Sequence, residues 1–251
     1  MTWEFTPSIK RQELYICNTN DEFSNPDGSP EYPYRNLSII ASKCPQIAAA
    51  SGLDSVFIPK FKLAAGTYEG FETSLAVVLE GIDPVVTEID SAITINASGI
   101  LSLANIGISD DLVAEEDALT VILNNIMVDT DNFTFDLVGN FKLLRGVIDA
   151  TTNEISAANI TIEDSEFVNT LTISMPDDGT ANIKNSVISA LAISTPAEGE
   201  AITINLFNCF ISTALDVPAR VTINARNVVL ENGTDTVTGT LNDLGITDLS
   251  T

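Results

Sequence analysis

From about residue 92 onward, short runs of β-branched residues alternate with polar residues, and little helical periodicity separates them. The clearest runs are 92–96, 159–162, 201–205 and 220–224, and three of these end in Ile-Thr-Ile-Asn or Val-Thr-Ile-Asn. Runs with this content and alternation predict β-strands. Their recurrence predicts an all-β chain assembled from repeated units.

A second apolar position follows each run at a nearly constant interval. The spacings between successive positions are 20, 21, 20, 20, 23 and 19 residues. Coils of this length with uneven loops predict a single-stranded, right-handed parallel β-helix with three strands per coil and about 8 coils over residues 55–232. The repeated apolar positions are Ile106, Ile126, Val147, Phe167, Val187, Phe210 and Val229.

Asparagine recurs two residues before this apolar position. Asn124, Asn185, Asn208 and Asn227 occupy four of the seven equivalent places, and Arg145 occupies a fifth. Asparagine tolerates left-handed backbone angles, and its amide can bond to the amides of neighbouring coils. The pattern therefore predicts a structural asparagine column at one turn of every coil.

The two ends of the chain depart from the repeat. An open β-helix exposes strand edges and core at its ends, so caps are expected. Apolar residues at helical spacing within 34–51, followed by Gly52, predict a helical cap inside an N-terminal arm and capping segment over 1–54. Residues 233–251 are polar and predict a C-terminal cap or tail.

Two short motifs flank the expected cap. The first runs from Asp27-Gly28 through Tyr32-Pro33-Tyr34 to Leu37 and Ile40-Ala41, and the second is Leu63-Ala-Ala-Gly66-Thr-Tyr68. Together they resemble the opening of the pectate-lyase-like superfamily of right-handed parallel β-helices. The resemblance implies a capping helix followed by the first coil. That superfamily includes pectin-degrading enzymes, phage tailspikes and non-catalytic virion proteins, and the spikes are commonly trimers.

Charge and composition narrow the function classes. Acidic residues outnumber basic ones 35 to 11, the net charge is −24, and the chain has no histidine. This charge disfavours nucleic-acid binding and favours basic partners and divalent cations. The lack of histidine excludes Ser–His and Cys–His nucleophiles and histidine metal sites. No apolar run is long enough for a membrane span, and we expect no secretory signal at Met1–Lys10.

One cluster could carry chemistry. The alignment places Arg145 near Glu163, Asp164 and Glu166 of the next coil, with Asp149 close by and Asp129 and Asp131 one coil back. Paired carboxylates serve as acid and base in glycoside cleavage, and an arginine could act as the base of a lyase. The competing interpretation is a solvated ion pair between coils.

Acidic turns at 110–117 and 177–179 could attract Ca²⁺, although they lack the spacing of an EF-hand loop. A solvated acidic turn is the alternative, and no other metal or cofactor is expected. Aromatic residues gather near the N-terminus and predict a packing or docking surface for partners. The residues in this docking group are Trp3, Phe5, Tyr15, Tyr32 and Tyr34.

These features favour a non-enzymatic virion component, such as a capsid decoration, tail or spike protein, that provides a rigid element for attachment or surface binding. Its expected partners are capsid or tail proteins, a possible host-surface glycan and two further copies in a homotrimer. The alternative function is a polysaccharide lyase or glycoside hydrolase that uses the carboxylates around Arg145.

Overall fold

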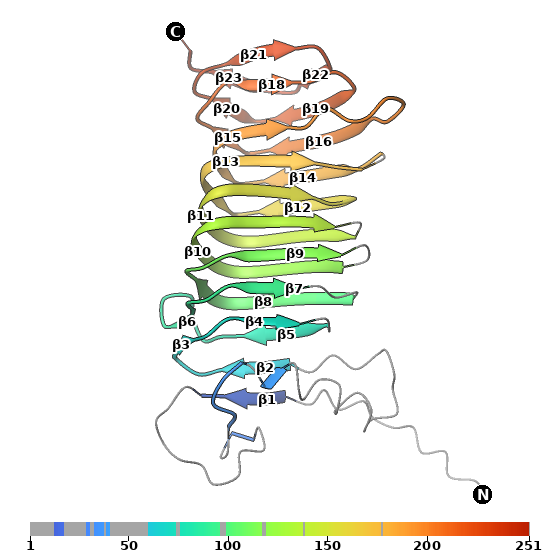
Figure 1. Ribbon diagram of the computed structural model, residues 1–251. Helices are drawn as coiled ribbons and strands as arrows, with labels where there is room; N and C mark the ends of the chain where they lie inside the picture. Colours follow the sequence, from blue (N-terminus) through green and yellow to red (C-terminus); the bar gives the residue numbers. More distant parts are fainter. Residues whose placement is uncertain are drawn as a thin grey trace, which may run out of the picture.

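The computed structural model describes residues 13–17, 29–30, 33–37, 39–40, 60–73, 76–95, 99–116, 119–137, 139–176 and 178–250. These residues form a parallel β-solenoid of about nine turns, drawn as a stack of coils in Figure 1. The predicted all-β parallel helix is therefore confirmed, with about nine turns where the sequence predicted about 8. Among the described residues, no helix is long and apolar enough to cross a bilayer.

Each coil contributes up to three parallel stretches, and the pairings between coils define three faces of the solenoid. Face I begins with β1 and ends with β22, and every neighbouring pair on it is parallel. Its strands are β1 (Glu13–Ile16), β2 (Lys60–Leu63), β5 (Val77–Glu80), the first parts of β8 (Gly99–Ile108), β10 (Leu119–Leu137) and β11 (Asn140–Ser156), then β12 (Asn159–Glu163), β14 (Thr180–Lys184), β16 (Ile202–Phe207), β19 (Val221–Arg226) and β22 (Thr240–Asp243).

Face II follows the first corner of each coil, and face III follows the second. Face II consists of β3 (Gly66–Tyr68), β6 (Thr87–Ile89), later parts of β8, β10 and β11, the starts of β13 (Glu166–Ser174) and β15 (Val187–Ile193), then β17 (Phe210–Ile211), β20 (Val228–Leu230) and β23 (Ile246–Asp248). Face III consists of β4 (Phe71–Thr73), β7 (Ile93–Ile95), β9 (Leu112–Glu116), the ends of β10, β11, β13 and β15, and the separate pair β18 (Leu215–Val217) and β21 (Thr234–Val237).

The core is built from side chains that point inward at every second strand position. Along face I, one such position stacks in register from coil to coil and is buried throughout. Stacking buries each coil's apolar face against its neighbours, which no coil can do alone. Three phenylalanine rings fill the interior of two adjacent coils, with centroids 4.8–6.3 Å apart (Phe133, Phe135 and Phe141). The stacked position is occupied by Leu101, Val121, Phe141, Ile160, Ala181, Ile204 and Ile223.

The N-terminal cap differs from the sequence-based expectation. Among the described residues only Ile39 and Ile40 are helical and no helix element is formed, so the predicted helical cap has no support. Residues 38 and 41–51 of that segment lie outside the described part. Tyr34 instead lies in a parallel bridge beside Ile16 of β1, where its N–H donates to the carbonyl of Tyr15 over 2.8 Å. Leu37 and Ile40 are fully buried. The described part of the segment therefore covers the end of the core with a bridge at Tyr34, a turn at residues 35–37 and buried side chains.

Candidate functional site

At the corner between faces I and II, one residue in each of seven successive coils has a left-handed backbone conformation. These residues have φ angles between 50° and 57°. The left-handed region is costly for most L-residues and tolerated by asparagine and aspartate, which explains the composition of the column. Its members, called the corner ladder below, are Asn105, Asn125, Arg145, Asp164, Asn185, Asn208 and Asn227.

Side-chain amides link most of the corner ladder along the solenoid axis. Asn208 donates from Nδ2 to Asn185 Oδ1 over 3.0 Å, and Asn227 donates to Asn208 Oδ1 over 2.7 Å. Equivalent bonds of 2.9 Å join Asn125 to Asn105 and Asn185 to Asp164. The structure places Asn185, Asn208 and Asn227 of the predicted column in this ladder, but it places Asn125 where the alignment had Asn124.

Arg145 is the one cationic member of the corner ladder. Its guanidinium donates from Nη2 to Asn124 Oδ1 over 2.8 Å, which gives Asn124 a separate role one residue before the ladder position. The three ion pairs among the described residues are Lys60–Glu80, Lys62–Glu13 and Lys184–Glu163, so none of them involves Arg145.

The acidic residues predicted to surround Arg145 separate into different places. Asp164 follows Arg145 in the corner ladder and accepts the bond from Asn185. Glu166 points outward on face II, in register with Val147 and Val187. Asp149 lies at the next corner, where its Oδ1 accepts a 3.0 Å bond from Asn169 Nδ2. The structure does not bring the four candidate residues into one hydrogen-bonded group.

A second asparagine ladder runs along face I near the later coils. Asn205 donates to Asn182 over 2.9 Å, Asn224 to Asn205 over 2.7 Å and Asn242 to Asn224 over 2.7 Å. Sequence reasoning missed this ladder. The signal was present, because two of the Ile-Thr-Ile-Asn and Val-Thr-Ile-Asn runs end in Asn205 and Asn224 at a spacing of 19 residues.

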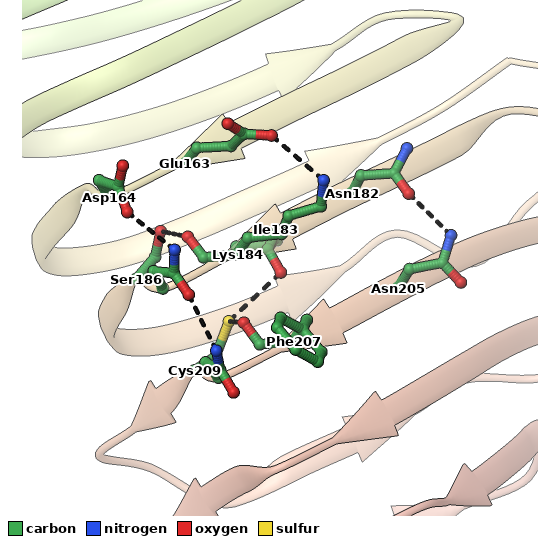
Figure 2. Close-up of polar contacts among 11 residues, drawn as sticks. Glu163, Asp164, Asn182, Ile183, Lys184, Ser186, Asn205, Phe207 and Cys209 are labelled. Carbon is green, nitrogen blue, oxygen red and sulfur yellow. Dashed lines mark hydrogen bonds and ion pairs between the residues drawn. The ribbon is translucent and has the colours of Figure 1, made fainter.

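Inside the same corner, small polar side chains serve the turn from within the core (Figure 2). Ser165 Oγ donates to the carbonyl of Glu163 and Ser186 Oγ to that of Lys184, each over 2.8 Å. Cys209 is the next member, with Sγ 3.4 Å from the carbonyl of Phe207. All three side chains are buried, and the carbonyls of Lys184 and Phe207 also accept backbone N–H bonds from Asp164 and Asn185 of the preceding coil. Burial raises the pKa of the Cys209 thiol.

Face II carries a column of outward side chains beside the corner ladder that is apolar except at Glu166. Two residues after each ladder residue from Asn125 onward, an outward side chain stacks in register with those of the next coils. Met127, Val147 and Val187 are 43–44% exposed. Val168 of β13, two residues after Glu166, is 42% exposed. The outward column, called the face II column below, consists of Met127, Val147, Glu166, Val187, Phe210 and Val229.

Carboxylates line a groove of about 330 Å³ at the corner between faces II and III. Asp129 and Asp149 point outward on adjacent strands in register, two positions after Met127 and Val147 of the face II column. Asp111 is held in place because its Oδ1 accepts bonds from Thr130 Oγ1 and Asn132 N. The groove, called the acidic groove below, is lined by Ser109, Asp110, Asp111, Asp129, Thr130, Asp131, Asp149 and Thr151.

The turns considered for Ca²⁺ have different positions. Asp110 and Asp111 belong to the acidic groove, whereas Asp117 and Asp177 lie outside the described residues. Over the part of the chain that the structure describes, no three Asp, Glu, His or Cys residues form a group that could hold a metal ion.

The aromatic docking group is only partly described, since Trp3, Phe5 and Tyr32 lie outside the described residues. Tyr34 is 7% exposed and belongs to the core, so its ring is not available at the surface. Tyr15 is half-buried on β1, with the ammonium of Lys62 5.9 Å from its ring centroid. It lines a cavity of about 580 Å³ at the first coils, together with Lys62, Leu63 and Glu80.

Comparison with protein-family models, with characterised proteins and with solved structures finds no match for this chain.

Proposed function

We propose that this chain is a non-enzymatic structural component of a virus particle, such as a capsid decoration, tail or spike protein, and that it provides a rigid element for attachment or surface binding. The observation that carries the proposal is the continuity of the stack. Faces I and II pair strand to strand in parallel from the first described coils to β22 and β23. About nine coils at about 4.8 Å each make a rod about 40 Å long.

Stiffness along the axis supports this role. Each coil is joined to its neighbours by backbone pairing on its faces and, through much of the rod, by amide bonds of the two ladders. A solenoid of this kind holds two attachment points at a fixed distance without requiring a substrate pocket. The high acidic charge adds solubility and selects basic partners.

The finer assignment comes from the motif resemblance to the pectate-lyase-like superfamily. On that basis we propose a right-handed coil, location in the virion, capsid or tail proteins as partners, and a homotrimer. Each of these is open to direct measurement. Handedness follows from an experimental structure, and the number of copies follows from the mass of the assembly in solution.

The decisive experiment is quantitative mass spectrometry of purified particles from the source, with copies of this chain counted relative to the major shell protein. We expect tens to hundreds of copies per particle, retained after a high-salt wash. An abundant host protein of similar acidity provides the control for adhering contaminants. A count no higher than that control, with the chain found in lysate or medium instead, would refute the virion assignment.

One observation keeps polysaccharide cleavage as a second candidate. Asp129 and Asp149 stand in register on adjacent strands, and neighbouring strands lie about 4.8 Å apart, which is near the carboxyl separation of retaining glycosidases. The test is release of reducing or unsaturated ends from a panel of acidic glycans. Loss of release in Asp149→Asn, with an unchanged thermal melt, would support this candidate, and no release by the wild-type protein would end it.

A further inference from the structure

We propose that the middle of face II docks a positively charged, partly aliphatic segment of another protein. The docking surface consists of Met127 and Val147 of the face II column together with Asp129, Asp131 and Asp149 of the acidic groove. The inference goes beyond the proposed function, because it names a surface and a partner chemistry and does not require that the partner be a virion protein.

The apolar half of this surface is unusual for an exposed sheet face. Met127 and Val147 are each 43% exposed, and they stand next to each other in register on β10 and β11. An outward strand position in contact with water is normally polar, whereas adjacent exposed aliphatic side chains mark interaction surfaces. On the next strand Glu166 stands in register with Val147, and Val187 follows it, so a further carboxylate interrupts the apolar strip beyond Val147.

The acidic half selects the occupant by its charge. Asp129 and Asp149 lie directly opposite each other, and like charges in that arrangement repel. None of the three ion pairs found among the described residues neutralises a carboxylate of the acidic groove. A cationic partner relieves this repulsion, whereas a second copy of this chain, with its own net charge of −24, would add to it.

The spacing of the two halves defines the partner further. Met127 and Asp129 are two residues apart on one strand, as are Val147 and Asp149, so each apolar side chain lies about 6.6 Å from a carboxylate-bearing position. An extended segment with lysine or arginine two residues from an aliphatic residue presents both kinds of side chain on one face at the matching distance. Lysine and arginine stems also cover apolar surface while their charged ends stay in water.

The experiment measures binding of a fluorescent seven-residue peptide by anisotropy at low ionic strength. The peptide has lysine at positions 1 and 5, leucine at positions 3 and 7, and serine between them, so that an extended chain presents lysine and leucine on one face. The comparison peptide carries glutamines in place of the lysines. We expect the lysine peptide to bind the full chain. The double variant Asp129→Asn/Asp149→Asn should bind it at least about four-fold more weakly, since two exposed ion pairs are lost and each contributes roughly two-fold or more. The glutamine peptide should bind more weakly than the lysine peptide to the wild type.

Matched controls remove the same charge and the same side chain elsewhere. Asp136→Asn/Glu154→Gln also neutralises two exposed carboxylates of β10 and β11, but on face III, and should change the affinity less than about two-fold. Val147→Thr should weaken binding, whereas Val237→Thr, at a 46% exposed site on β21 of face III, should not. Circular dichroism verifies that each variant is folded.

Three results would overturn the proposal. Equal losses in the two double variants would mean that the peptide senses only the overall charge. If Val147→Thr binds the lysine peptide as tightly as the wild type, and the glutamine peptide binds the wild type as tightly as the lysine peptide, neither the apolar nor the acidic half contributes to binding. Complete displacement of the peptide by millimolar Ca²⁺ at constant ionic strength would assign the acidic groove to a metal ion. None of these results depends on the number of copies per virus particle, so the proposed structural function is tested independently of this surface.

Discussion

The corner ladder predicts that Asn208 stabilises the rod through both its backbone conformation and its amide. Asn208 has a φ of 52°, donates to Asn185 over 3.0 Å and accepts from Asn227 over 2.7 Å. Its side chain is exposed, so each bond contributes near the lower end of the usual range, about 0.5 kcal/mol. An alanine in the left-handed region costs about 1 kcal/mol more. Asn208→Ala should therefore lower the free energy of unfolding by about 2 kcal/mol.

Asn208→Gly separates the two contributions. Glycine loses both amide bonds but adopts the left-handed conformation freely, so we expect it to lose about 1 kcal/mol, or half of the alanine effect. The assay is urea unfolding followed by circular dichroism, with hydrogen exchange of the β16 and β19 amides as a local measure, because repeat proteins can unfold in parts. Equal losses in the two variants, or a loss below about 0.5 kcal/mol in Asn208→Ala, would refute this reasoning.

Further predictions concern the core, a tight corner and two titrating groups. Phe133→Ala should destabilise the chain by about 3–5 kcal/mol in urea unfolding, because it removes the fully buried ring that contacts the other two phenylalanines of the core cluster. Gly107→Ala should be destabilising by about 2 kcal/mol or more in the same assay, because a Cβ there would meet the carbonyl oxygen of Pro84. Burial raises the pKa of the Cys209 thiol above its ordinary 9.0, so the stability that the neutral thiol provides is lost as the pH rises beyond 9. The urea midpoint of Cys209→Ser should therefore fall less between pH 7 and pH 10 than that of the wild type. Backbone N–H groups of the following turn lower the pKa of Asp243 below its ordinary 3.8, so the stability that its carboxylate provides should disappear only as the pH falls through that lower value. An NMR titration of the carboxyl carbon with a midpoint at or above 3.8 would contradict this assignment.

The repeat length was readable from the sequence, but the register was not. The alignment matched Ile126 with Val147, whereas the structure pairs Ile126 with Gly146 and Met127 with Val147. Hydrophobicity cannot distinguish these alternatives, because the outward column of face II is itself apolar. Side chains alternate between the two faces of a strand, so a slip of one residue exchanges inside for outside. The same slip accounts for Asn124 in place of Asn125.

The candidate site was harder to predict from the sequence than the fold, since it depends on which outward residues of neighbouring coils lie side by side. Asp129 and Asp149 were recognised as neighbours in successive coils, but their proximity to Asp110 and Asp111 depends on how the corner after β8 folds. The repeat gave the position of Arg145 at the corner but not the direction of its side chain, and for this reason Arg145 was predicted to face carboxylates. The structure turns that guanidinium toward Asn124 of the preceding coil.

The asparagine ladders also give the rod an electrical direction. In every bonded step between ladder residues, the Nδ2 group belongs to the later coil and the accepting oxygen to the earlier one. The amide dipoles are therefore parallel, and parallel hydrogen-bonded dipoles polarise one another. The sum is partial positive charge toward the early coils and partial negative charge toward β22, where Asn242 holds the outermost amide. A cation that binds at the ends of the rod would therefore favour one end over the other. The two ends differ in partial charge as well as in chain direction.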